Sequence, residues 1–170
     1  IEKGGSPAAI NGTETAGGRT YLKTHVGGGS SNFVGFRLKD AEGNLFAIPE
    51  AGDTLIFSMD INPSASFTPN TGTQGFLLRQ GDSSGFPGTG EQYKQLAPTT
   101  AIPANQWTTV TGSFAFTDAW KVSRGNPNKS LSLGIRTNAE MDIKIDNVSY
   151  KVVRAAEKVE AGWEVEPGWT

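Results

Sequence analysis

The sequence predicts an all-β domain in which two antiparallel sheets pack face to face. Short segments along the chain alternate apolar and polar residues, as strands with one covered face do. The 22 Gly and 9 Pro residues lie between these segments and form no repeat, which is typical of turns between short strands. A length of 170 residues is within the range of a single domain of this class.

The last third of the chain carries the clearest alternation, in the segments TTVTGSFAF (108–116), SLSLGIRT (130–137) and MDIKIDNVSYKVV (141–153). In the second segment, Leu133 and Ile135 fall on one side of the pleat, and Ser132 and Arg136 fall on the other. We therefore expect a core face of aliphatic residues and an outer face that is open to solvent.

Earlier segments with the same pattern are RTYLKTHV (19–26), NFVGFRL (32–38), TLIFSMDIN (54–62), QGFLLRQ (74–80) and EQYKQL (91–96). The segment over 54–62 is expected to be a central strand, because Leu55, Phe57 and Met59 share one face. Residues 1–18 show no sustained period and are expected to form a loose lead-in with at most one short strand. The sandwich is thus predicted over residues 19–153, and a linker or short helix over 154–170.

Composition narrows the possible partners. The 15 basic and 17 acidic residues are scattered singly and give a net charge of −2, so no basic patch favours nucleic acid or an anionic membrane. No apolar run reaches the length of a membrane span, so no membrane insertion is expected. The lack of cysteine excludes a disulfide framework and thiolate metal ligands. Because the chain begins at Ile1 without a start methionine or signal peptide, we expect a mature product or a module of a longer polypeptide.

The order of the motifs is more specific than any one of them. A Gly-led strand GGRTYLKT precedes AGDTLIFSMDINPS, a Trp follows in ANQWTTVTGSFAF, and the series ends with LSLGIRT and IKIDNVSY. This order resembles that of the carbohydrate-binding modules of the CenC-like kind, which accompany cellulases and xylanases, and it covers residues 19–153. The resemblance implies a jelly-roll β-sandwich that binds a saccharide without catalysis.

Modules of this kind also occur inserted in bacteriophage tail proteins, where they hold cell-wall saccharides. The resemblance therefore implies that the partner is a polysaccharide or a bacterial cell-wall saccharide. It also implies further domains in the parent polypeptide and an extracellular, secreted or virion-associated location.

A saccharide site needs an aromatic ring for the CH face of the sugar and planar polar groups for its hydroxyls. On three predicted strands, polar residues oppose the apolar face and are expected to form one strip across a sheet, namely Asp60, Arg79 and Arg136. Tyr93 and Gln95 lie in EQYKQL, and the resemblance places the counterpart of this segment beside the binding groove.

Large aromatics elsewhere are open to two interpretations. Trp120 and Phe86 lie in long polar loops, where an aromatic residue is either an exposed platform or an anchor folded onto the core, and we favour the platform for Trp120. Trp107 opens a strand and is expected to be structural. The predicted site is therefore Asp60, Arg79, Tyr93, Gln95, Trp120 and Arg136. The alternative is that its polar members are solvated surface residues.

No cofactor is required by this prediction. The resembled modules often hold a structural Ca²⁺ near their termini, and Asp146 in the IDNV run matches the aspartate that contributes to it. Because Ca²⁺ needs six or more oxygen ligands, Glu2 or Glu14 would have to replace an early acidic ligand that is glycine here.

Two other functions remain open at this point. A structural or protein-interaction domain of a virion or cell surface would use the same sandwich as a scaffold. Such a domain should show an exposed apolar patch or an unpaired strand edge. An enzyme is less favoured, because His25 is the single histidine, lies on a predicted strand, and is not accompanied by a G-x-S-x-G run.

Overall fold

The computed structural model describes residues 2–4, 9–28, 33–39, 42–44, 49–70, 74–81, 93–96, 100–117 and 130–155. These residues form the strands β1 (Glu2–Gly4), β2 (Ala9–Ala16), β3 (Arg19–Val26), β4 (Phe33–Arg37), β5 (Thr54–Pro63), β6 (Gly75–Gly81), β7 (Tyr93–Leu96), β8 (Thr108–Ala115), β9 (Ser130–Arg136) and β10 (Met141–Val153). Sheet A has the order β1-β4-β9-β6-β7, and sheet B has the order β2-β3-β10-β5-β8. The strand pairs in both sheets are antiparallel.

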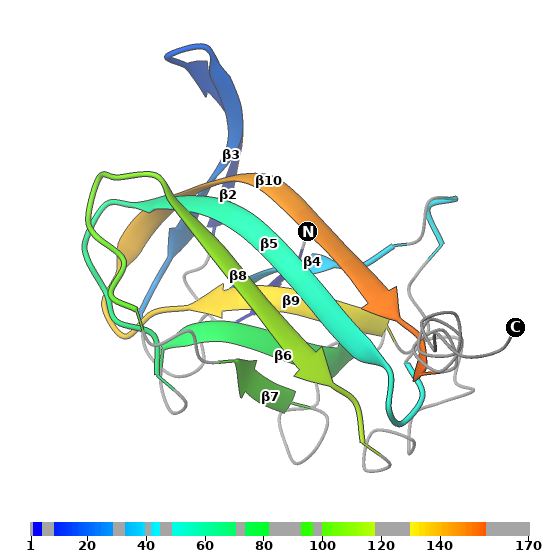
Figure 1. The fold of residues 1–170 in the computed structure, drawn as a ribbon. Helices are drawn as coiled ribbons and strands as arrows, with labels where there is room; N and C mark the ends of the chain where they lie inside the picture. Colours follow the sequence, from blue (N-terminus) through cyan, green and yellow to red (C-terminus); the bar gives the residue numbers. More distant parts are fainter. Residues whose placement is uncertain are drawn as a thin grey trace, which may run out of the picture.

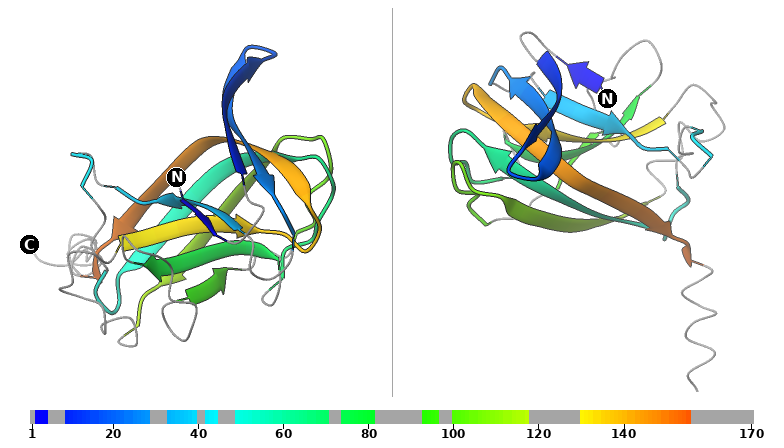
Figure 2. Two further views of the ribbon diagram at one scale, coloured as in Figure 1. Left: turned by 180° about the vertical axis from the view of Figure 1, so that it is seen from behind. Right: turned by 90° about the horizontal axis from the view of Figure 1, so that it is seen from above.

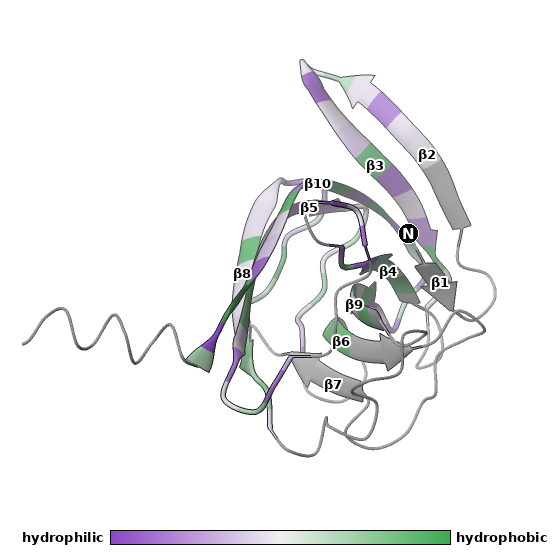
Figure 3. Cartoon of the chain, turned by 90° about the vertical axis from the view of Figure 1, so that its right-hand side faces the viewer, coloured by the Kyte–Doolittle hydropathy of each residue, from purple (hydrophilic) through white to green (hydrophobic). Residues whose placement is uncertain are grey.

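The two sheets form the two layers of a sandwich, with sheet B curving over sheet A (Figures 1 and 3). The prediction of an all-β jelly roll built from two antiparallel sheets is confirmed. The segment over 54–62 is also central as predicted, because β5 lies between β10 and β8. The closing strand β10 is 13 residues long and pairs with β3 over residues 141–145 and with β5 over residues 143–153, with a register shift between Asp146 and Ser149.

The first 18 residues are more ordered than the expected loose lead-in. Residues 2–4 form β1 at the edge of sheet A, and residues 9–16 form β2 at the edge of sheet B. β2 and β3 make a hairpin that extends beyond the body of the sandwich (Figures 1 and 2). The side chains from Thr13 to Ala16 are exposed, so the pairing with β3 rather than a buried face holds this strand.

The core lies between the sheets and contains the residues that the alternation places inside. On β5 every second residue from Leu55 to Ile61 is buried, with at most 1% of its surface exposed. Across the core the rings of Phe57 and Phe76 lie 6.3 Å apart, which joins sheet B to sheet A. The aliphatic side chains of β9 and β10 complete this layer, namely Leu131, Leu133, Ile135, Ile143 and Ile145.

Close packing at one point of the core depends on glycine. Gly112 on β8 lies directly across from Phe57 on β5. A Cβ atom at Gly112 would lie 2.6 Å from Cε1 and 2.7 Å from Cζ of the Phe57 ring, which is closer than real carbon contacts. The glycine therefore leaves the space that the ring occupies.

A buried carboxylate fixes the start of β5 to the end of β10. Asp53, which is 3% exposed, accepts hydrogen bonds from the backbone N–H groups of Glu50 and Ala155. It also forms an ion pair with Arg154. Burial raises the pKa of Asp53, but these hydrogen bonds outweigh burial and hold the pKa below its ordinary value of 3.8. The contacts tie the turn before β5 to the residues that follow β10.

Candidate functional site

The register of sheet A puts three of the residues predicted for the site at neighbouring backbone positions on two paired strands. On β6, Arg79 alternates with the buried Phe76 and Leu78 and therefore belongs to the opposite side of the pleat. Its partner across the sheet is Tyr93 on β7. Residues directly opposite each other in an antiparallel pair share one face, so Arg79 and Tyr93 are neighbours on the outer face.

Gln95 extends this group by one step along β7. It pairs with Leu77 on β6, and Leu77 in turn pairs with Gly134 on β9. Gly134 pairs with Gly35 on β4. Leu77, which lies in this row on the same side of the pleat as Arg79, is fully buried, so this part of the face is covered. Tyr93 and Gln95 are two residues apart and so lie about 7 Å apart along the strand.

Arg136 does not belong to the open surface that the sequence predicts. It alternates with Leu133 and Ile135 as expected, yet it is only 7% exposed, and Ser132 on the same side is 2% exposed. The Nε atom of Arg136 makes no hydrogen bond, although the residue makes other interactions. The expected wet outer face of β9 is therefore wrong, because alternation along a strand gives the side of the pleat and not whether that side is open.

Asp60 lies on the other sheet, so the expected single strip across one sheet is also wrong. It belongs to the outer face of sheet B, where its cross-strand partner on β10 is Asp146. The Arg19 side chain on β3 binds both carboxylates, with Nη2 at 2.8 Å from Asp60 Oδ2 and Nε at 3.0 Å from Asp146 Oδ2. Like charges directly opposite each other destabilise a sheet, and the guanidinium compensates them.

Two further donors complete the bonding of Asp60. The Thr109 hydroxyl donates to Oδ1 at 2.6 Å, and the Asn147 side-chain amide donates to Oδ2 at 2.8 Å. These two hydrogen bonds, and then the contact with Arg19, hold the pKa of Asp60 below its ordinary value of 3.8 and outweigh burial, which raises it. Asp60 is therefore an ionised structural group whose lone pairs are already engaged.

Aromatic rings cover the other side of this guanidinium. The Cζ atom of Arg19 lies 4.3 Å from the ring centroid of Trp107, and Trp107 meets Tyr21 edge to face at 5.7 Å. The Tyr21 hydroxyl donates to Glu14 at 3.3 Å. Trp107 thus has the structural role that its position predicts, although it packs on the outer face of sheet B rather than in the core. We call Arg19, Asp60, Asp146, Trp107 and Tyr21 the Arg19 cluster.

The described contacts of Asp146 engage both of its carboxylate oxygens, and the predicted calcium site stays a prediction. One carboxylate oxygen of Asp146 binds Arg19, and the other accepts the backbone N–H of Asn147 at 2.7 Å. Within the described ranges, no group of three or more His, Cys, Asp or Glu side chains could hold a metal.

Trp120 and Phe86 lie outside the described residues, so their predicted roles stay predictions. Sequence reasoning missed Arg19 and Asn147. Asn147 is a non-glycine residue with a φ of 49°, at the point where the register between β10 and β5 shifts by a bulge. The Asp-Asn pair inside an otherwise alternating strand was the available signal, since asparagine tolerates this backbone conformation.

The two antiparallel sheets have the layered arrangement of a jelly-roll sandwich, a fold that this chain shares with solved carbohydrate-binding modules.

Solved structures with this fold were found at low sequence identity. A CBM22-1 xylan-binding domain from Paenibacillus barcinonensis Xyn10C is 16% identical, with 89% of this chain and 85% of that chain covered and a TM-score of 0.54. A CBM4 structure is 17% identical, with 86% and 93% covered and a TM-score of 0.51. The CBM22-1-GH10 modules of Clostridium thermocellum Xyn10B, complexed with xylohexaose, are 15% identical, with 88% and 25% covered and a TM-score of 0.51.

No protein-family model matches the sequence, and no curated protein matches it either. The similarity to the solved modules is thus one of fold. Among the described residues there is no helix of the length and apolarity needed to cross a membrane.

Proposed function

We propose that this chain is a non-catalytic carbohydrate-binding module that attaches a larger extracellular or virion-associated protein to a polysaccharide or cell-wall saccharide. The observation that carries the proposal is the register of sheet A, which makes Arg79 and Tyr93 direct neighbours and places Gln95 one step further along the same face. The jelly-roll fold shared with known carbohydrate-binding modules supports it.

The residue types at these positions suit a sugar chain. A tyrosine ring can stack against the CH face of a pyranose, and an amide and a guanidinium can exchange hydrogen bonds with its hydroxyls. The spacing of about 7 Å between Tyr93 and Gln95 allows both residues to contact one ring and its linkage.

Xylan is the first ligand to test. One module with the same fold is a xylan-binding domain, and another was solved in complex with xylohexaose. Bacterial cell-wall saccharide is the second ligand to test, because the parent protein in this proposal is either an enzyme or a phage tail protein, and a tail protein would bind a cell wall.

Affinity electrophoresis through gels containing soluble xylan, mixed-linkage glucan or cell-wall saccharide measures binding by the whole chain. We expect retardation in one of these gels, and a loss of affinity of about tenfold or more in Tyr93→Ala and Arg79→Ala, because a stacking or charged anchor is worth about 1.4 kcal/mol or more. Intrinsic tryptophan fluorescence and urea unfolding show that each variant is folded.

Lys151→Ala and Ile56→Ala are the matched controls. Both residues are exposed on the outer face of sheet B, and Ile56 is 39% exposed. They remove a cation and an apolar side chain without touching sheet A, so they should leave the retardation unchanged. Equal losses in the controls and in the sheet A variants would refute the assignment of the surface.

A structural or protein-interaction domain is the second candidate, and the hairpin of β2 and β3 favours it. The hairpin extends from the sandwich, and β2 is an edge strand whose outer side is unpaired in the described sheet (Figure 1). Unpaired edges are common sites of protein contact. Silence across the whole saccharide panel, with the protein folded, would transfer our preference to this candidate.

A further inference from the structure

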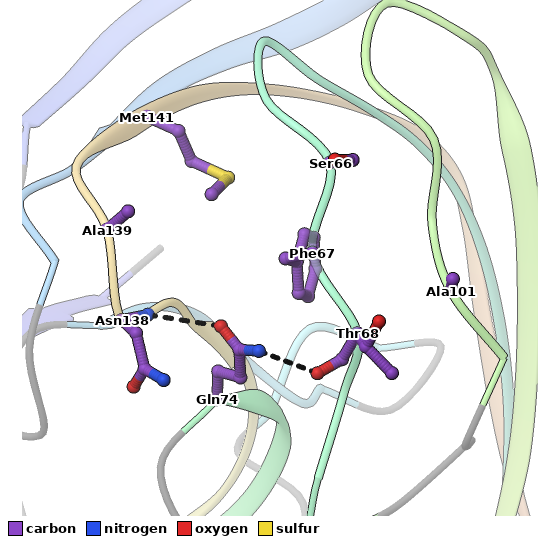
Figure 4. A pocket seen from close by; sticks show the side chains of 8 residues that line it. All are labelled: Ser66, Phe67, Thr68, Gln74, Ala101, Asn138, Ala139 and Met141. Carbon is purple, nitrogen blue, oxygen red and sulfur yellow. Dashed lines mark hydrogen bonds between the residues drawn. The ribbon is translucent and has the colours of Figure 1, made fainter.

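A cavity lies at one end of the sandwich, away from the outer face of sheet A. It has a volume of about 320 Å³ and opens between the connection that follows β5 and the turn that joins β9 to β10 (Figure 4). Ser66 and Thr68 lie on one side with Phe67 between them, Ala139 and Met141 lie on the facing side, and Ala101 lies beyond Phe67; the buried Phe67 and Met141 make the floor.

Backbone hydrogen bonds hold these walls in place. Phe67 and Ile102 form an isolated antiparallel bridge, with N–H to O distances of 3.1 and 2.9 Å in the two directions. Ser64 N–H donates to Asp142 O at 2.8 Å, which joins the wall after β5 to β10. The cavity is therefore preformed by the fold.

Gln74 closes the base of the cavity. Its Nε2 donates to the backbone oxygen of Thr68 at 2.7 Å, and its Oε1 accepts the backbone N–H of Asn138 at 3.4 Å (Figure 4). One side chain thus connects the two walls. Both ends of the amide are used in this way, so Gln74 serves as part of the frame.

The remaining lining groups form an apolar floor and a polar rim. Phe67 and Met141 are 5% and 4% exposed and provide the floor. Within the part of the chain that the structure describes, the hydroxyls of Ser66 and Thr68 and the side-chain amide of Asn138 have no hydrogen-bond partner. None of the lining residues that the structure describes carries an ionisable side chain.

We propose that this cavity binds the terminal ring of a neutral saccharide. The floor matches the apolar CH groups of a sugar, and the free hydroxyl and amide groups match its hydroxyls. The absence of charge on the described lining disfavours an ionic ligand. A volume of about 320 Å³ is at the lower end of small-molecule sites, so one ring or two fit, whereas a continuous chain does not.

This inference rests on the proposed saccharide-binding function, but it concerns a separate surface and can fail separately. The outer face of sheet A would bind along a chain, and the end cavity would bind where a chain stops. The two sites therefore predict different preferences, for long polymers on sheet A and for short sugars with a free end at the cavity.

The methionine methyl groups report on the cavity directly. The chain has two methionines, of which Met141 lines the cavity and Met59 is fully buried in the core. Whole protein labelled with ¹³C in the methionine methyls should give two signals, and Met59→Leu assigns them. On addition of D-xylose, D-glucose, xylotriose or cellotriose we expect a saturable shift of the Met141 signal, with the Met59 signal unmoved.

Ala101→Phe blocks the cavity from an exposed position and should weaken this response at least tenfold. Ala104→Phe is the matched control, since Ala104 is exposed on the same connection and does not line the cavity. It should leave the response unchanged. Tyr93→Ala should also leave it unchanged, because sheet A is a different surface.

Each outcome decides one of the two proposals. Retardation in xylan gels with a Met141 signal that no short sugar moves, or that moves equally in Ala101→Phe, would overturn the end cavity and leave the sheet A proposal standing. A saturable Met141 shift without retardation in any gel would support the cavity and remove the sheet A proposal. Failure of both measurements would reject both.

Discussion

Replacing Arg19 by alanine tests whether a guanidinium, rather than a metal ion, holds Asp60 and Asp146 together across β5 and β10. Arg19 makes two charge-assisted contacts, at 2.8 Å to Asp60 and 3.0 Å to Asp146, and it stacks on Trp107 at 4.3 Å. Without it, two carboxylates would lie directly opposite each other with no cation between them.

The size of the effect follows from these contacts and their exposure. Hydrogen bonds to charged groups contribute about 1.5–3 kcal/mol each. The side chains of Arg19, Asp60 and Asp146 are 31%, 13% and 20% exposed, so solvent screening favours the low end of that range. Stacking on Trp107 adds about 0.5–1 kcal/mol, and ordering the long arginine side chain costs about 1.5–2 kcal/mol. We expect Arg19→Ala to lower the free energy of unfolding by about 2 kcal/mol and the Tm by about 4–8 °C.

Urea unfolding at pH 7, followed by tryptophan fluorescence, measures this loss. Lys151→Ala, which removes an exposed cation from the same face of sheet B, should stay within about 0.5 kcal/mol of the parent protein. The pKa of Asp60 is held below 3.8 in the folded protein, so its contribution is present above that pH and is lost as the pH falls through the folded-state pKa. The difference between Arg19→Ala and the parent should therefore shrink in strongly acidic solution.

Calcium addition and chelation provide the opposing test. If the guanidinium takes the structural role, the Tm of the parent protein should be the same in excess Ca²⁺ and in a chelator. A Tm that rises with Ca²⁺ concentration, or an Arg19→Ala loss below about 0.5 kcal/mol, would show that the reasoning about this cluster is wrong.

Two further changes test the core and the pH response. Gly112→Ala should destabilise the protein by about 1–3 kcal/mol in urea unfolding, because the new methyl group collides with the Phe57 ring, and an unchanged midpoint would contradict the packing described. The hydrogen bond with Asp142 at 2.8 Å, opposed by burial and assisted by Glu140, raises the pKa of His25 above its ordinary value of 6.5. The stabilisation that protonated His25 gives the folded protein is therefore complete below pH 6.5 and is lost as the pH rises through the folded-state pKa. We expect His25→Gln to lower the free energy of unfolding more at pH 5.5 than at pH 8.5, by less than about 1 kcal/mol. The Cε1 proton of the single histidine gives one NMR signal that can be followed with pH, and a titration midpoint at or below 6.5 would refute this expectation.

The strands that sequence alone predicted well are those with one buried face. β5 shows why, since Leu55, Phe57 and Met59 recur at every second position and are all buried. β2 was missed because Thr13 and Glu14 are exposed and form no alternating pattern. That strand depends on its pairing with β3, which is a property of the partner rather than of the segment itself.

The candidate site was predicted less well, for a different physical reason. A period of two gives the side of the pleat on which Asp60 and Arg79 lie, but not which sheet each strand joins, and they prove to be in different sheets. Alternation also placed Arg136 on the outer side of β9 without showing that this side is covered. Tyr93 and Arg79 come together because β6 and β7 are consecutive and antiparallel, which is the simplest pairing to expect.

The position of β10 sets the order in which this domain can form. Sheet B has β3 and β5 on either side of residues 141–153, so a nascent chain lacks the centre of that sheet until this strand has left the ribosome. The contacts that close the fold join segments far apart in sequence, which makes folding slow and leaves the earlier strands exposed while synthesis continues. Chaperones that protect incomplete chains should therefore raise the yield of folded protein. A fragment that lacks β10 is expected to be insoluble, because β3 and β5 then have no strand between them.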